Sequence, residues 1–223
     1  MQALGIDLAG VPDKPTGLAV FNGKSARVRT LHTDREILET CRQIQPAVIA
    51  IDAPLSRPRR GSLRKCDRIL IERGLRVFPP LFGGMKKLTE RGIRLAKNLR
   101  RSRFEVIEIH PRTSGILLFG TPERSRWTRQ MREAGLTIPD EMSVHEIDAL
   151  VAALTGWFYL MSGTEAVGTQ NKIVIRSQTL SKRFYSCRQA CQPNAHHVRN
   201  ALHRDFCSLP RRDVQDRGGD KPW

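Results

Sequence analysis

The run AVIAIDAPL at residues 47–55 places the tightest limit on the fold of this chain. A continuous apolar stretch of this length is typical of a strand covered on both faces, as in the sheets of α/β proteins. Asp52 stands near the carboxyl end of the run, directly after Ile51, and Pro54 ends the strand. The pattern therefore predicts a buried strand that carries a carboxylate at its end.

Three further strand patterns precede this run. Each is short and is separated from the next by residues rich in Gly, Pro, Asp and Asn, which is the pattern of an antiparallel meander. The three predicted strands are residues 3–10, 16–22 and 26–32.

Helix patterns separate and follow the strands. Thr33 and Glu36 form a capping-box signature at the start of a helix that ends before Pro46. A fifth strand pattern covers residues 104–111, and Pro111 ends it. Together these elements predict an α/β fold with a mixed five-stranded sheet, three antiparallel strands followed by two parallel ones, flanked by helices.

The later part of the chain is mainly helical in pattern. The predicted elements are two basic helices around residues 64–73 and 85–102, an Arg-rich helix starting at Thr121 and Pro122, a long apolar helix at 143–163 and a hairpin at 165–176. No sustained periodicity follows, so we expect one domain over residues 1–176 and a basic tail over residues 177–223.

Acidic residues interrupt four of the core patterns. They lie in the first, fourth and fifth strands and in the long helix, and they are Asp7, Asp52, Glu108 and Asp148. Burying an unpaired carboxylate costs several kcal/mol, so each position needs a cation, a proton or strong hydrogen bonds. A local ion pair with an arginine explains any one of them alone, but four at such positions favour a shared site.

The pairing of the first and fourth strands would bring Asp7 and Asp52 within a few ångströms of each other. Two carboxylates so placed repel each other unless a divalent cation neutralises them, and oxygen ligands suit Mg²⁺ or Mn²⁺ rather than Zn²⁺. Two such ions can activate a water and stabilise the leaving oxygen of a phosphodiester. We therefore expect two metal ions, with Asp7, Asp52, Glu108 and Asp148 as ligands and catalytic residues.

His145 precedes Asp148 by three residues and shares its helix face. It is a candidate catalytic residue, either as a metal ligand or as a proton carrier, although a surface histidine near a helix start is an equally common finding. Glu146 has a simpler explanation, because it completes a capping box with Ser143.

The charge balance points to a polyanionic partner. Lys and Arg number 38 against 22 Asp and Glu, a formal net charge of +16. Basic residues follow Asp52 and recur downstream, where they would hold phosphates beside the acids, although a solvated basic face is the alternative. The predicted nucleic-acid contacts are Arg57, Arg59, Arg60, Arg64, Lys65, Lys86, Lys87 and Arg112.

Between the two basic helices, Phe78 and Phe82 lie in a segment rich in Pro and Gly. The segment predicts either a loop that stacks on bases or, more commonly, a hydrophobic plug.

The cysteines do not indicate a disulfide framework. Five is an odd number, and Cys41 and Cys66 lie in helix patterns, so we expect reduced thiols there. A zinc site formed by cysteines and histidines between residues 187 and 207 is weakly indicated by their spacing. No apolar run is long enough to span a membrane and the first ten residues lack a basic segment, so we expect a soluble, cytoplasmic protein without a membrane partner.

Several motifs in order resemble a known family. They are GIDLAG, PTGLAV, AIDAPLSRP, CDR, GLRVFPPLFGGM, LTERG, EVIEIHPRTS and HEIDALVAALTG, and the resemblance covers about residues 1–176. The family is domain of unknown function 429, predicted nucleases of the RNase H fold related to Holliday-junction resolvases.

The resemblance implies roles for particular residues. By it, Asp7 would bridge two metals, Asp52 would complete one site and Asp148 the other, while Glu108 is not required by the resolvase pattern. It also implies a nucleic-acid substrate, DNA or RNA and possibly branched. Junction resolvases cut two strands symmetrically as dimers, so a homodimer is a further expectation.

Two other functions fit parts of the pattern. A non-catalytic nucleic-acid-binding protein of the same fold would keep the basic surface without the chemistry. An actin-like ATP-binding or kinase-type protein would also begin with GIDLAG and a hairpin, but no later glycine-rich adenosine motif follows.

Overall fold

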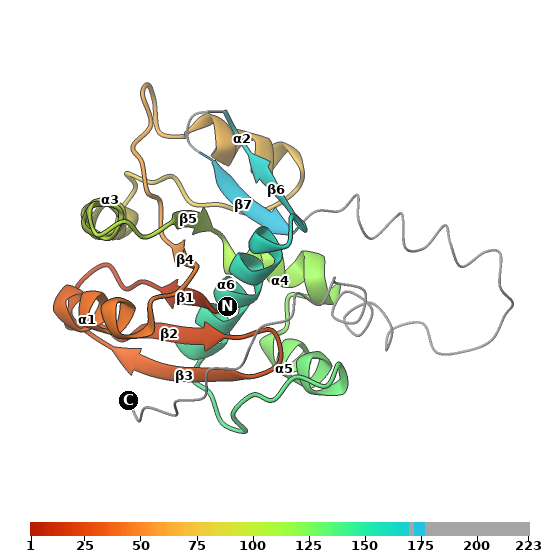
Figure 1. Cartoon of the computed structure of the whole chain (residues 1–223). Coiled ribbons are helices and arrows are strands. Elements are labelled where there is room, and N and C mark those ends of the chain that lie inside the picture. Colours follow the sequence, from red (N-terminus) through yellow and green to blue (C-terminus); the bar gives the residue numbers. More distant parts are fainter. Residues whose placement is uncertain (170–171, 177–223) are drawn as a thin grey trace, which may run out of the picture.

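The computed structural model describes residues 1–169 and 172–176. These residues form one seven-stranded sheet in the order β3-β2-β1-β4-β5-β7-β6 (Figure 1). The predicted tail at 177–223 and its cysteines and histidines lie outside the described residues. The strands are β1 Ala3–Asp7, β2 Thr16–Phe21, β3 Ala26–Leu31, β4 Val48–Asp52, β5 Val106–Ile109, β6 Thr164–Val167 and β7 Ile173–Arg176.

The strand directions confirm the predicted RNase H-like arrangement. Strands β1, β2 and β3 are an antiparallel meander, and β4 and β5 add parallel to β1. The prediction of five strands was too low, because the hairpin of β6 and β7 joins the same sheet. Strand β7 pairs in parallel with β5, through Glu108 with Ile173 and Ile109 with Val174. The sequence pattern identified this hairpin, but it did not predict that β7 would pair with the free edge of β5.

Helices cover both faces of the sheet. On one face lie α4 (Pro111–Phe119), α5 (Arg124–Glu133) and α6 (Val144–Leu160), which share a core with alternate residues of β1, β4 and β5. On the other lie α1 (Asp34–Ile44) and α3 (Met85–Arg101). A third apolar cluster joins α2 (Lys65–Glu72) to β6 and β7. Within the described residues, no helix is both long and apolar enough to cross a membrane.

The local signals in the sequence are largely confirmed. Thr33 and Glu36 form the predicted capping box of α1, and Ser143 and Glu146 form that of α6. Cys41 and Cys66 are buried free thiols.

The region after β5 differs from prediction. Helix α4 begins at Pro111 immediately after the strand and was not predicted, and α5 begins only at Arg124, so the expected start at Thr121 and Pro122 was wrong. Proline fits the first turn of a helix, and here Pro111 rather than Pro122 has that position.

Helix α6 lies against β1 and β2 at backbone contact distance, because two glycines leave room for it. A Cβ atom on Gly5 would overlap the carbonyl oxygen of Ala149 and the backbone nitrogen of Ala153, and one on Gly17 would overlap the carbonyl of His145. Figure 1 shows α6 crossing the centre of the molecule beside these strands. The glycines therefore set the distance between the helix and the sheet.

We predict that Gly5→Ala lowers the free energy of unfolding by about 3 kcal/mol, because the obstructing atoms belong to helix backbone and can move only with the whole helix. Urea unfolding measures the change. Gly84→Ala is the matched control, since no atom lies within 4 Å of its added Cβ and its φ is −62°. Equal stability of the two variants would contradict the close packing of α6.

Candidate active site

Two aspartates meet at the carboxyl ends of β1 and β4. Asp7 and Asp52 are direct partners in the parallel pairing of these strands, as predicted. Side chains alternate between faces along a strand, and Asp7 has the same parity as Gly5, which contacts α6. Asp52 has the parity of Ala50, which belongs to the core beneath α6. Both carboxylates therefore lie on the α6 face of the sheet.

Helix α6 adds His145 and Asp148 to this pair. Gly17 is the cross-strand partner of Asp7 and lies against the backbone of His145, so the absence of a side chain at Gly17 lets the first turn of α6 approach Asp7. His145 Nδ1 lies 2.7 Å from Asp7 Oδ2. Asp148, one turn further along, is almost fully buried.

Arg124, the first residue of α5, forms the strongest contact of Asp148. Its Nε donates to Oδ1 at 2.7 Å and its Nη2 donates to Oδ2 at 2.6 Å, a bidentate ion pair. Sequence reasoning missed Arg124, because nothing in the Arg-rich segment sets it apart from its neighbours. The contact depends on the packing of α5 beside α6, which no local pattern reports.

The aspartates perturb one another. Burial, followed by repulsion from Asp7, Asp148 and Glu108, raises the pKa of Asp52 well above its ordinary value. Burial and the charge of Asp148 also raise the pKa of Asp7, against the lowering effect of the His145 hydrogen bond. The charged forms of Asp7 and Asp52 are thus destabilised by burial and by the neighbouring carboxylates.

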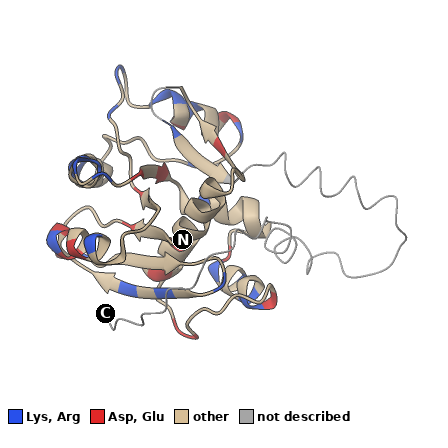
Figure 2. Cartoon of the chain, in the orientation of Figure 1, with Lys and Arg blue, Asp and Glu red and all other residues tan. Residues whose placement is uncertain are grey.

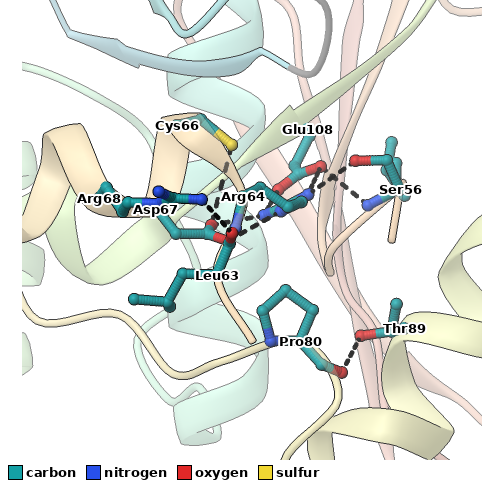
Figure 3. A network of polar contacts seen from close by, with 10 residues as sticks. Ser56, Leu63, Arg64, Cys66, Asp67, Arg68, Pro80, Thr89 and Glu108 are labelled. Atoms are coloured by element: carbon teal, nitrogen blue, oxygen red, sulfur yellow. Dashed lines mark hydrogen bonds and ion pairs between the residues drawn. The ribbon is translucent and has the colours of Figure 1, made fainter. Parts of the chain in front are cut away.

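Glu108 is held in a separate network. Strand β5 pairs Glu108 with Ile51 rather than with Asp52, so its side chain leaves the sheet on the face away from α6. Both oxygens are engaged there: Arg64 donates to Oε1 at 2.6 Å and to Oε2 at 2.8 Å (Figure 3). The backbone N–H of Leu55 also donates to Oε2, at 2.8 Å. The predicted metal ligand therefore braces the loop after β4.

Arg64 does not lie on the surface where the sequence placed it. It is 4% exposed and bridges Glu108, Asp67 and Ser56, so its guanidinium is not available to a phosphate (Figure 3). Its pKa is raised by the hydrogen bonds to the two carboxylates, against the effect of burial. The sequence could not distinguish this arginine from its exposed neighbours.

The other predicted basic contacts are exposed. They are Arg57, Arg59, Arg60, Lys65, Lys86, Lys87 and Arg112. Figure 2 shows positive charge along the loop between β4 and α2, on α2 and on α3.

The loop before α3 presents aromatic side chains to solvent. Phe78 and Phe82 are 70% and 72% exposed, so the interpretation of this segment as a buried plug was wrong. The loop is nevertheless ordered, since Thr89 Oγ1 donates to the Pro80 carbonyl at 2.7 Å and the backbone N–H of Met85 donates to the Phe82 carbonyl at 3.0 Å.

Helix α3 connects this loop to the acids. Helix α3 packs closely against the segments that follow Asp7 and Asp52. A Cβ atom added to Gly10 would lie 3.3 Å from the backbone nitrogen of Leu88, and one added to Gly92 would lie 2.9 Å from the Cβ of Ala53. Arg91 of α3 also donates to the Ala9 carbonyl at 2.8 Å. The aromatic loop and the exposed Lys86 and Lys87 therefore extend from the edge of the sheet that carries the aspartates.

The donor set suits a hard divalent cation. Asp7, Asp52 and Asp148 offer only carboxylate oxygens, and within the described residues the side chain of Asp52 has no hydrogen-bond or ion-pair partner. As arranged here, however, no three His, Cys, Asp or Glu side chains in residues 1–169 and 172–176 are placed to hold a metal ion. Arg124 engages both oxygens of Asp148 in this arrangement.

The mixed sheet, its helices and the paired aspartates define an RNase H-like α/β protein with a carboxylate site. The chain belongs to the family described as "Protein of unknown function (DUF429)", which matches residues 5–171. This match confirms the family resemblance seen in the motifs.

Solved structures of RuvC from Thermus thermophilus are similar to the chain. The one described as "T. thermophilus RuvC in complex with Holliday junction substrate" is 18% identical, with 73% of this chain and 96% of that chain covered and a TM-score of 0.49. The one described as "Thermus thermophilus RuvC structure" is 19% identical, with 73% and 97% covered and a TM-score of 0.46. No curated protein matches the chain.

We predict that Asp52→Asn stabilises the metal-free protein. The pKa of Asp52 is raised on folding, so the folded state binds its proton more tightly than the unfolded chain and loses stability as pH rises through the folded pKa. In the presence of chelator, the variant should gain about 1 kcal/mol of unfolding free energy at pH 8, and the gain should vanish as pH falls below about 4. Urea unfolding across this range measures it, with the exposed Asp13→Asn as control. A loss of stability at pH 8 would contradict the repulsion among the aspartates.

Proposed function

We propose that this protein is a metal-dependent nuclease that hydrolyses phosphodiester bonds. The observation that supports the proposal best is the register pairing of Asp7 with Asp52 on the face where α6 presents Asp148. Burial and mutual repulsion disfavour the charged forms of Asp7 and Asp52 in the absence of a cation, so their convergence beside Asp148 favours a functional reason.

Asp7, Asp52 and Asp148 would hold Mg²⁺ or Mn²⁺, since their charges act on one another at this end of the sheet. A divalent cation held by these residues would supply charge neutralisation and an activated water for phosphodiester hydrolysis. His145 orients Asp7 through the 2.7 Å contact and, at 47% exposure, also reaches solvent, where it can accept or return a proton.

The substrate surface in this proposal is the basic and aromatic flank of the site. Exposed lysines and arginines supply contacts to phosphates, and Phe78 and Phe82 supply planar faces for unpaired bases. Glu108 and Arg64 serve this surface indirectly, since they fix the loop that carries Arg57, Arg59 and Arg60.

We predict cleavage of nucleic acid that depends on Mg²⁺ or Mn²⁺ and on the aspartates. Labelled duplex, single-stranded, hybrid and four-way junction substrates are incubated with the full chain and resolved on denaturing gels. Asp7→Asn and Asp148→Asn should each reduce the rate by about 100-fold or more, because each removes a ligand charge.

Asp13→Asn is the control for this experiment, since Asp13 is an exposed aspartate in the loop after β1. Binding of every substrate class without cleavage, with either metal, would contradict the nuclease proposal and favour a non-catalytic nucleic-acid-binding protein. That alternative uses the same exposed basic residues and leaves Asp148 with Arg124.

We predict that the exposed phenylalanines bind unpaired bases. Phe78→Ala and Phe82→Ala should each weaken the binding of a single-stranded oligonucleotide by about tenfold, the value of one lost stacking contact. Fluorescence anisotropy of a labelled oligonucleotide measures the dissociation constant. Ile71→Ala, an exposed apolar residue on α2, is the control, and equal effects of all three variants would contradict a stacking role.

A further inference from the structure

Arg124 is the only arginine or lysine that contacts an aspartate of the carboxylate site, among the residues that the structure describes. Its charge also opposes the rise that burial causes in the pKa values of Asp7 and Asp52. His145, the other basic group here, carries a positive charge only when protonated. One guanidinium therefore supplies the permanent positive charge opposite three carboxylates.

The position of Arg124 costs free energy that its contacts must offset. It is the first residue of α5, and a cation near a helix N-terminus is opposed by the positive end of the helix dipole. Two contacts hold it there: the two hydrogen bonds to Asp148, and the ring of Trp127, whose centroid lies 5.6 Å from Arg124 Cζ. Trp127 is itself fixed, because its indole N–H donates to the Thr121 carbonyl at 2.7 Å.

The two side chains of this ion pair differ in their access to solvent. The Arg124 side chain is 30% exposed, whereas that of Asp148 is 11% exposed. The arginine can therefore turn to solvent without unfolding α5, while Asp148 stays within α6 and keeps its place beside Asp7.

We propose that Arg124 is a resident counter-ion of the carboxylate site, which holds Asp148 in the metal-free protein and competes with divalent cations for it. The guanidinium binds both oxygens of Asp148, so a metal ion gains this ligand only when the arginine leaves. Arg124 is thus a positioning residue that keeps the carboxylates in place and sets the metal concentration at which the site fills. The inference rests on the proposed metal site, but not on cleavage of a substrate.

The test is Mn²⁺ binding to the full chain, measured by electron paramagnetic resonance of free Mn²⁺, for the wild type, Arg124→Gln and Arg124→Lys. Arg124→Gln should bind Mn²⁺ about tenfold more tightly than the wild type, since a competing charge-assisted pair has been removed. Arg124→Lys should fall between them, because an ammonium keeps the charge but loses the paired geometry.

Arg129→Gln is the matched control. Arg129 is an exposed arginine on the same helix, and its substitution should leave the Mn²⁺ affinity unchanged.

A second readout is thermal unfolding. Without metal, Arg124→Gln should melt at a lower temperature than the wild type, and Mn²⁺ should raise its melting temperature by more than that of the wild type. Should Arg124→Gln not fold without metal, Arg124→Lys provides the same comparison.

Equal or weaker Mn²⁺ affinity in Arg124→Gln would overturn the proposal, as would an equal gain in Arg129→Gln or no Mn²⁺ binding by any variant. A failure of the nuclease proposal is a separate result. Were no substrate cleaved while Arg124→Gln bound Mn²⁺ more tightly, the counter-ion role would stand without the nuclease.

Discussion

The close approach of α6 to β1 and β2 is the constraint on which the site depends. Gly5 and Gly17 have no side chains, so the backbone of the helix lies directly on the sheet, and its first turn reaches the end of β1. A helix one side chain further away would leave His145 out of contact with Asp7 and would separate Asp148 from both strand aspartates. The close packing at these two glycines thus determines the positions of the polar side chains in the site.

Charge balance is the second organising factor. The protein places two groups of acids near the same edge of the sheet and gives each its own arginine. Arg64, buried between β5 and α2, satisfies Glu108 and Asp67 permanently. Arg124, partly exposed, satisfies Asp148 in a way that can open. Burial of the first pair and exposure of the second distinguish a structural ion pair from one that can exchange with a ligand.

Much of this arrangement was predictable from short-range patterns. Short runs separated by turn residues and one continuous apolar run identified the strands, and capping boxes located the starts of α1 and α6. The buried strand at residues 47–55 implied pairing with β1. The adjacency of Asp7 and Asp52 followed from that pairing, because each stands at the carboxyl end of its strand. Local signals did not reveal α4, since its apolar residues follow β5 without a turn.

The sequence alone determined most of the elements, their order and the acids that interrupt them. Only the tertiary structure decided which of those acids meet. Glu108 pairs with Ile51 rather than with the next residue, Asp52, so its side chain lies on the face of the sheet away from α6. The packing of α5 on α6 brings Arg124 to Asp148. Burial separated Arg64 from the exposed arginines around it. Strand register and helix docking are long-range relations between segments, so they cannot be read from the neighbours of a residue in the chain.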